Sequence, residues 1–276
     1  MKKFFARARA VLEDKGGEGY VVSDIHGFYT PMVEALAEAG FFEDKEPHKL
    51  IVCGDMFDRG FEALKVQEFM LDLLHRDELI YIRGNHEDMF VRMLDYLQTC
   101  DMYHIYEINR FITNGLMDTA AQLSEITERD CYRRPRKMVD KAKRTPYYTK
   151  LIPASVDFFE TEHYVFVHGW IPARQIGNDH RRYAYESDWR TADELSWKRA
   201  RWYNGMELAH DFKVTEQGKT IVCGHWHTSF GHSKYEGRGS EFEKDSDFSP
   251  FSEEGILAID ACTAYSQKVN CIVIED

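Results

Sequence analysis

Several features that would point to particular classes of protein are missing from this sequence. No stretch reaches the ~18 consecutive apolar residues that a membrane-spanning helix needs. None of the 6 cysteines forms a Cys-x-x-Cys pair, and a chain of 276 residues needs no disulfide framework to fold. The net charge is −12, so an excess of basic residues for broad nucleic-acid binding is also absent. We therefore expect a cytoplasmic protein that binds neither membranes nor nucleic acids in general.

The bulk composition is that of an ordinary globular protein. Hydrophobic residues make up 43% and charged residues 30% of the chain. The length is sufficient to bury a sizeable core. No internal repeat divides the sequence, and Arg7, Arg9 and Glu13 interrupt the apolar core that a signal peptide would have at the N-terminus. We predict a single domain over residues 1–276.

Five short apolar runs end abruptly in polar residues, as buried strands do at a turn. They are residues 19–22, 49–53, 79–82, 164–167 and 220–223. Helical spacing at 30–39 and 61–74 separates the first three runs, which is the rhythm of strand–helix–strand units in an α/β fold. Ligand sites in open α/β sheets lie beyond the carboxyl ends of the strands. We expect the five polar clusters to converge at such an edge.

The remaining segments complete the predicted fold. Residues 88–150 read as a helical insertion, whose basic residues form either a solvated face or a guide for acidic substrates. Runs at 255–260 and 269–274 suggest a second, more antiparallel sheet, and 231–254 reads as a loop. The fold class is thus α/β, an α+β sandwich of two mixed sheets flanked by helices. Four histidines outside the clusters are expected at the surface: His163, His180, His210 and His232.

The polar clusters contain seven side chains of metal-ligand type. Mixed carboxylate and imidazole ligands suit Mn, Fe or Zn better than Ca or Mg. Seven ligands are too many for one tetrahedral site, but they suit two adjacent ions that share a carboxylate. Asp55, which follows the neighbouring strand, is the candidate for the shared ligand. The seven are Asp24, His26, Asp55, Asn85, His168, His225 and His227.

Residues beside these ligands supply the rest of a hydrolytic site. Two adjacent divalent ions clamp the attacking and leaving oxygens of an in-line displacement, with a bridging hydroxide as nucleophile. Arg59 is suited to grip phosphate oxygens as a planar fork. His86 is suited to act as general acid to the leaving group, and Asp58 to hold its imidazolium.

The motifs, taken together, resemble the calcineurin-like metallophosphoesterases, in particular the bacterial and phage type of phosphoprotein phosphatase. The resemblance covers roughly residues 18–275. Its motifs occur in the family's order: SDIHG at 23–27, GDMFDRG at 54–60, GNHE at 84–87, HG at 168–169 and GHWH at 224–227. Ser23 stands where the family usually has Gly, and the second His of GHWH is typical of the broader superfamily rather than of many protein phosphatases.

The resemblance implies roles for individual residues. It makes Asp24, His26 and His227 ligands of the first metal, Asp55 the bridge, and Asn85, His168 and His225 ligands of the second. It supports His86 as general acid, Asp58 as its partner and Arg59 as a phosphate ligand. The family's second phosphate arginine follows a Leu/Ile-x-Trp segment, which here points to Arg199, with Arg201 in reserve.

Three functions follow, and they differ in substrate or in activity. The first is hydrolysis of phosphate monoesters by a serine/threonine phosphatase-like enzyme. The alternative is a dinucleoside polyphosphate hydrolase or a phosphodiesterase acting on nucleotides. The third is an inactive scaffold, which would be signalled by loss of His86 or of a ligand, and none is lost.

Overall fold

The structure, a computed structural model, describes residues 18–99, 105–177 and 182–275. None of the helices in these ranges combines the length and the apolar character needed to cross a bilayer. Of the cysteines in these ranges, Cys53, Cys131, Cys223, Cys262 and Cys271 are free thiols. Cys100 and His180, which entered the predictions above, lie outside the described residues.

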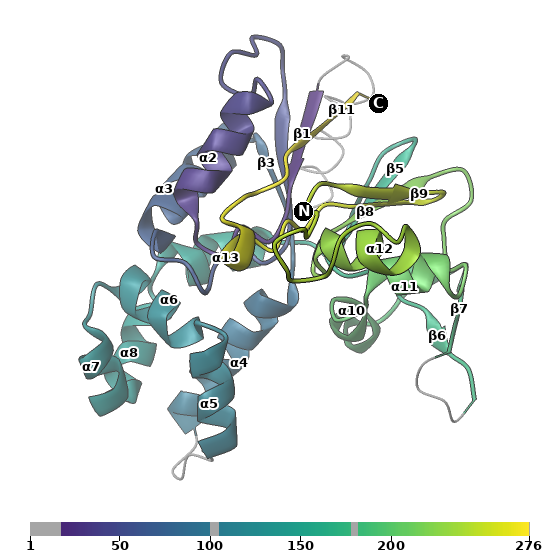
Figure 1. Cartoon of the computed structure of the whole chain (residues 1–276). Coiled ribbons are helices and arrows are strands. Elements are labelled where there is room, and N and C mark those ends of the chain that lie inside the picture. The colour runs from purple at the N-terminus through teal and green to yellow at the C-terminus, as the bar shows by residue number, and fades with distance from the viewer. Residues whose placement is uncertain (1–17, 100–104, 178–181, 276) are drawn as a thin grey trace.

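The first sheet carries three of the five predicted strands. Its order is β11-β1-β2-β3, with β1, β2 and β3 parallel and β11 antiparallel to β1. The strands are β1 (Glu18–Val22), β2 (Lys49–Cys53), β3 (Leu79–Ile82) and β11 (Ile272–Glu275). Figure 1 shows the connecting helices α2 (Tyr29–Glu38) and α3 (Ala63–Arg76) together beside this sheet. The predicted strand–helix–strand units are confirmed.

The second sheet carries the other two predicted strands at its centre. Its order is β4-β5-β8-β10-β9, and β8 lies parallel to both β5 and β10. The strands are β4 (Phe159–Glu160), β5 (Tyr164–Phe166), β8 (Thr220–Cys223), β9 (Phe251–Glu253) and β10 (Ile256–Ala258). The prediction that 269–274 belongs to this sheet is wrong, because β11 pairs with β1. An apolar run predicts a strand but not its partner.

The two sheets pack face to face through a dry layer. Val21, Ile51 and Ile80 from the first sheet meet Phe166 and Val222 from the second, and all five are fully buried. A larger core lies between the first sheet and its helices. Strands buried on both faces are expected to be continuously apolar, which is why these runs do not alternate. The packing confirms the predicted class of two mixed sheets with flanking helices.

The predicted helical insertion is present and begins where β3 ends. Gly115, at φ +79°, interrupts a stretch that reads as continuous helix in the sequence. The helices are α4 (Asn85–Thr99), α5 (Ile105–Thr113), α6 (Leu116–Ser124), α7 (Glu128–Arg133) and α8 (Pro135–Ala142). A π-helical turn (Tyr147–Leu151) and α9 (Ile152–Ala154) lead back to the second sheet.

Further short elements complete the fold, most of them around the second sheet (Figure 1). Residues 231–254, predicted as a loop, contain most of α12 and all of β9, and His232 is buried rather than exposed. His232 bonds the Glu236 carboxylate and the Ser249 carbonyl, so a polar residue is satisfied inside. The elements are β6 (Arg174–Gln175), β7 (Tyr183–Ala184), a 3-10 turn (Trp189–Thr191), α10 (Glu194–Ala200), α11 (Gly205–His210), α12 (Thr228–Tyr235) and α13 (Thr263–Ser266).

Candidate metal centre

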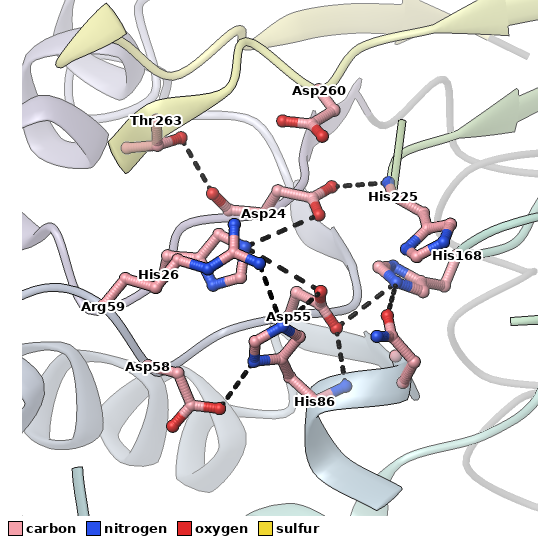
Figure 2. Close-up of polar contacts among 12 residues, drawn as sticks. Asp24, His26, Asp55, Asp58, Arg59, His86, His168, His225, Asp260 and Thr263 are labelled. Atoms are coloured by element: carbon pink, nitrogen blue, oxygen red, sulfur yellow. Dashed lines mark hydrogen bonds and ion pairs between the residues drawn. The ribbon is translucent and has the colours of Figure 1, made fainter. Parts of the chain in front are cut away.

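Most of the predicted ligands lie together where the carboxyl ends of both sheets meet. Asp24 and His26 follow β1, Asp55 follows β2, and Asn85 is the first residue of α4 after β3. His168 and His225 come from the second sheet, after β5 and β8, and Figure 2 shows both facing Asp55. The convergence predicted from the strand ends is therefore present.

Asp55 lies between two groups of donor atoms. Its carboxylate is 3.9 Å from His26 Nε2 on one side and 3.3 Å from His168 Nε2 on the other. Donor atoms of Asp55, His168 and His225 all lie within 4.8 Å of one another, and so do those of Asp55, His26 and His86. Asp24 Oδ1 is 4.0 Å from His26 Nε2, on the same side. One carboxylate thus faces two possible cation positions.

The imidazoles are held so that one nitrogen remains available. His26 Nδ1 lies 2.9 Å from the Phe57 carbonyl, and His168 Nδ1 lies 2.8 Å from the Cys53 carbonyl. A carbonyl accepts a hydrogen bond from Nδ1–H, which leaves the lone pair of Nε2 for a metal ion. His168 Nε2 then faces another acceptor, the Asn85 Oδ1, at 2.7 Å. A shared cation would satisfy both atoms, so this donor set fits a metal.

Burial shifts the pKa values of the predicted ligands in the directions expected for buried side chains whose charge no cation compensates. Burial and the nearby Asp260 raise the pKa of Asp24 well above its usual range. Burial, Asp24 and Glu87 do the same to the pKa of Asp55. Burial lowers the pKa of His168 to about 4, so its imidazole is neutral near pH 7. Crowded carboxylates beside neutral imidazoles are the environment that a multivalent cation stabilises.

The backbone at the site is strained. Non-glycine residues seldom have positive φ, and such residues cluster at functional sites where the surroundings enforce the conformation. Six predicted site residues have φ between +47° and +80°: Asp24, His26, Asp55, Asp58, Arg59 and His225. Each such residue costs on the order of 1–3 kcal/mol of conformational free energy. The fold therefore holds these side chains in position at a loss of stability.

Close packing of neighbouring loops enforces these conformations. The N–H groups of Asp24 and His26 donate to the carbonyls of Gly54 and Asp55, which ties the β1 loop to the β2 loop. Gly54 has φ +84°, and a Cβ there would collide with the His168 ring. A glycine in the GDMFDRG motif is therefore required by the approach of a ligand from the other sheet.

Glu87 organises the Asp55 loop, and the sequence motif GNHE did not reveal this role. Its fully buried carboxylate accepts hydrogen bonds from the N–H groups of Gly84, Asp55 and Met56, at 2.7–3.1 Å. Two backbone turns are thus held by one side chain. Among the described side chains of the insertion, no other charged residue is as deeply buried as Glu87, and its position follows from the turn that opens α4.

We expect Glu87→Gln to lower the free energy of unfolding by about 1.5–3 kcal/mol, because an amide NH₂ would face backbone donors that now meet a carboxylate. Urea denaturation followed by circular dichroism measures the change. The exposed Glu38→Gln serves as the matched control and should be neutral within about 0.5 kcal/mol. Equal stability of the two variants would contradict this role of Glu87.

His86, Asp58 and Arg59 form a separate unit beside the ligands. His86 Nδ1 is 2.7 Å from Asp58 Oδ2, so Asp58 accepts a hydrogen bond from Nδ1–H. His86 Nε2 lies 3.3 Å from Arg59 Nη2 and 3.9 Å from Asp55. Burial raises the pKa of Asp58, although its bond to His86 acts in the opposite direction. Nε2 thus points toward Asp55, as a proton donor to a leaving group should.

His227 and Arg199 are placed differently from the other predicted site residues. His227 Nε2 contacts Glu241 Oε1 at 2.8 Å, on the segment predicted to be a loop. Arg199 is exposed and lines a hollow with Ala173 and Tyr203. The reserve candidate Arg201 is buried and bridges the carboxylates of Asp88 and Asp157. The phosphate-binding role of Arg199 stays a prediction.

Asp260 is a buried carboxylate at the site that received no role from the sequence. Figure 2 shows it beside Asp24. Burial and Asp260 raise the pKa of Asp24. Burial also raises the pKa of Asp260, although its hydrogen bond from Cys262 and the nearby His227 act in the opposite direction. The Asp260 carboxylate accepts this hydrogen bond from the Cys262 N–H at 2.7 Å. The Ile259-Asp260 dipeptide before the last strand was the available signal.

A comparison with models of protein families shows to which family the chain belongs. The family model described as calcineurin-like phosphoesterase matches residues 20–229. The chain belongs to the calcineurin-like phosphoesterase family. This family uses divalent metal ions, in agreement with the donor set around Asp55.

Curated relatives within this family carry two kinds of name. A bis(5'-nucleosyl)-tetraphosphatase of Bacillus velezensis is 26% identical over 168 residues, or 59% of this chain and 60% of that protein. The corresponding protein of Bacillus subtilis is 25% identical over 59% of this chain. A serine/threonine-protein phosphatase 1 of Salmonella typhimurium is 37% identical over 25% of this chain and 30% of its own length. The chain thus matches about 60% of the length of the first of these relatives.

Solved structures confirm the fold. A cold-active protein-tyrosine phosphatase of a Shewanella species matches with a TM-score of 0.50 and 15% identity, covering 94% of this chain and 76% of that one. A protein serine/threonine phosphatase of Saccharomyces cerevisiae matches with the same TM-score and 13% identity, covering 99% and 88%. At these identities the likeness concerns the arrangement of sheets and helices alone.

Proposed function

We propose that this chain is a metal-dependent hydrolase of phosphoric esters, with two metal ions (Mn, Fe or Zn) held by the seven predicted ligands. The observation that carries the proposal is the position of Asp55 between two groups of donors, 3.9 Å from His26 and 3.3 Å from His168. Asp24, His26 and His227 would hold one ion, and Asn85, His168 and His225 the other. When bound, the ions supply Lewis acidity and lower the pKa of water.

The chain's own residues bind the substrate and move the proton. Arg59 presents a guanidinium at His86, where it would orient phosphate oxygens beside the general acid. Asp58 fixes the His86 ring through Nδ1, so that a protonated ring directs Nε2–H at the leaving oxygen. The buried Asp58–His86 contact also keeps water from competing for Nδ1.

Two substrate classes remain, and the comparisons favour the nucleotide class. The two relatives described above that are named as bis(5'-nucleosyl)-tetraphosphatases each align over 59% of the chain, whereas the named serine/threonine phosphatase aligns over 25%. We therefore place dinucleoside polyphosphates ahead of phosphoproteins as the substrate. The site residues themselves serve either class equally.

A substrate panel tests this function. The purified chain, supplied with Mn²⁺, is assayed on p-nitrophenyl phosphate, bis-p-nitrophenyl phosphate, diadenosine tetraphosphate and a phosphothreonine peptide. We expect hydrolysis of p-nitrophenyl phosphate and of diadenosine tetraphosphate, abolished by a chelator and restored by the metal. Absence of cleavage of all four compounds after loading with Mn²⁺, Fe²⁺ or Zn²⁺ would refute the proposal.

A further inference from the structure

A cleft of about 540 Å³ opens directly beside the candidate metal centre. Asn85, a predicted ligand, lies in its wall. The other walls come from α4 and α5 of the insertion and from α10 with the turn that follows it. Figure 1 shows these helices grouped below the two sheets. The volume lies within the ~300–1,000 Å³ that is usual for small-molecule sites.

The cleft is cationic in an otherwise acidic protein. Four cations line it, Arg83, Arg92, Arg110 and Lys198, against two carboxylates, while the whole chain carries −12. A concave wall of one sign concentrates counter-charged ligands even when the net charge opposes them. The cleft therefore offers a local site for an anion with several charges.

Both carboxylates of the lining are already paired, Asp88 in part by a cation of the same lining. Asp88 accepts from Arg83 at 2.7 Å and also from the buried Arg201, while Asp95 pairs with Lys143 at 2.8 Å. Within the described part of the chain, Arg110 has no carboxylate partner. The remaining charge in the cleft is therefore positive and available.

Two of the lining cations, unlike Arg83, are held by ion pairs at the surface. Arg92 pairs with Glu107 and Lys198 with Glu194, and the two basic side chains are 56% and 47% exposed. Exposed pairs of this kind contribute little to stability. A phosphate group could replace these carboxylates at little cost.

Trp202 links the cationic cleft to the metal centre. Its side chain is 45% exposed although it is a large aromatic. The Arg110 guanidinium lies 5.5 Å from its ring centroid, and the ring of the ligand candidate His225 lies 5.8 Å away, edge-on. An exposed aromatic face next to an arginine is the usual platform for stacking a nucleobase.

We propose that this cleft is the subsite for the nucleoside part of a nucleoside polyphosphate, with the base stacked on Trp202 and Arg110. The distal phosphates lie along Arg83, Arg92 and Lys198, while the phosphoryl group that is attacked sits at the metal centre. This assignment rests on the proposed function. A singly phosphorylated peptide would place its phosphate at Arg59 and leave several cations of the cleft without a counter-charge.

The test compares two substrates across matched variants. For Trp202→Ala and Arg110→Ala we expect kcat/KM for diadenosine tetraphosphate to fall about 10- to 100-fold, the scale of one lost stacking contact. The fall for p-nitrophenyl phosphate should be at least about tenfold smaller, because this compound is too short to reach the cleft. Trp202→Phe should recover most of the loss, since it keeps an aromatic face.

Two exposed residues of the same insertion provide the controls. Tyr106→Ala removes an exposed aromatic from α5, and Arg129→Ala removes an exposed cation from α7. Neither lines the cleft. Both variants should keep kcat/KM for the two substrates within about twofold of the parent, as surface substitutions usually do.

Binding separates the subsite from the reaction itself. Titration calorimetry of diadenosine tetraphosphate with the Mn²⁺-loaded His86→Asn variant, with and without Trp202→Ala, measures affinity while turnover is slowed. If the parent chain cleaves no phosphate ester but the affinity still depends on Trp202, the proposed function is refuted and the subsite stands. Equal losses on both substrates, or no effect of Trp202 and Arg110 on diadenosine tetraphosphate, would overturn the subsite. Dependence seen only with a phosphothreonine peptide would overturn its nucleotide occupant.

Discussion

His86→Asn should lower kcat on phenyl phosphate about 10²–10⁴-fold while the metal content stays unchanged, because a general acid contributes this much when the leaving group is a poor one. Phenolate needs a proton to leave, whereas p-nitrophenolate leaves readily without one. The loss on p-nitrophenyl phosphate should therefore fall at the low end of that range. His86 Nε2 lies near Arg59 and Asp55, and Nδ1 is held by Asp58 at 2.7 Å, so the ring is placed to donate.

Steady-state kinetics on the two aryl phosphates and metal analysis of the same samples measure these effects. His75→Asn, an exposed histidine in the last turn of α3, is the matched control and should retain full turnover. If His86→Asn matches the parent on phenyl phosphate, His86 is not the general acid. If it instead loses metal, it is a ligand, as its place among the donor atoms around Asp55 would permit.

Asp55→Asn should release both metal ions together and remove nearly all turnover. Its carboxylate faces donors from both groups, so the loss of one negative charge affects two positions at once. Substitutions that only support a ligand cost ~10–100-fold in metal affinity, so the loss of the shared ligand should exceed about 100-fold for each ion. Dialysis against Mn²⁺ at fixed free concentration followed by elemental analysis gives the two affinities.

The exposed Asp72→Asn on α3 controls for the change of charge and should bind metal as the parent does. Loss of one ion with retention of the other would show that Asp55 serves a single position. Full occupancy with full activity would exclude Asp55 as a ligand altogether.

Much of the fold was predictable because its signals are local. Strands β1, β2 and β3 are buried on both faces, so each is a continuous apolar run that ends in a polar motif. Parallel neighbours place those motifs at one edge, and this alone brings Asp24, Asp55 and Asn85 together. The convergence of His168 and His225 follows from the same rule applied to the second sheet.

The rest depends on contacts between distant segments, which composition does not encode. The partner of β11 is set by the register Tyr20↔Val273, not by the apolar run itself. The pairing of His227 with Glu241 was hidden because a Gly/Ser-rich, charged stretch resembles a solvated loop. The bridging of Asp88 and Asp157 by Arg201 joins α4 to a segment near β4, and no spacing in the sequence points to it.

The metal stoichiometry of the purified chain tests the central claim most directly. After loading with Mn²⁺ and removal of free ions, elemental analysis should find two ions per chain, and the same sample should cleave p-nitrophenyl phosphate. A chain that never retains more than one Mn²⁺, Fe²⁺ or Zn²⁺ ion and cleaves no phosphate ester would contradict the account.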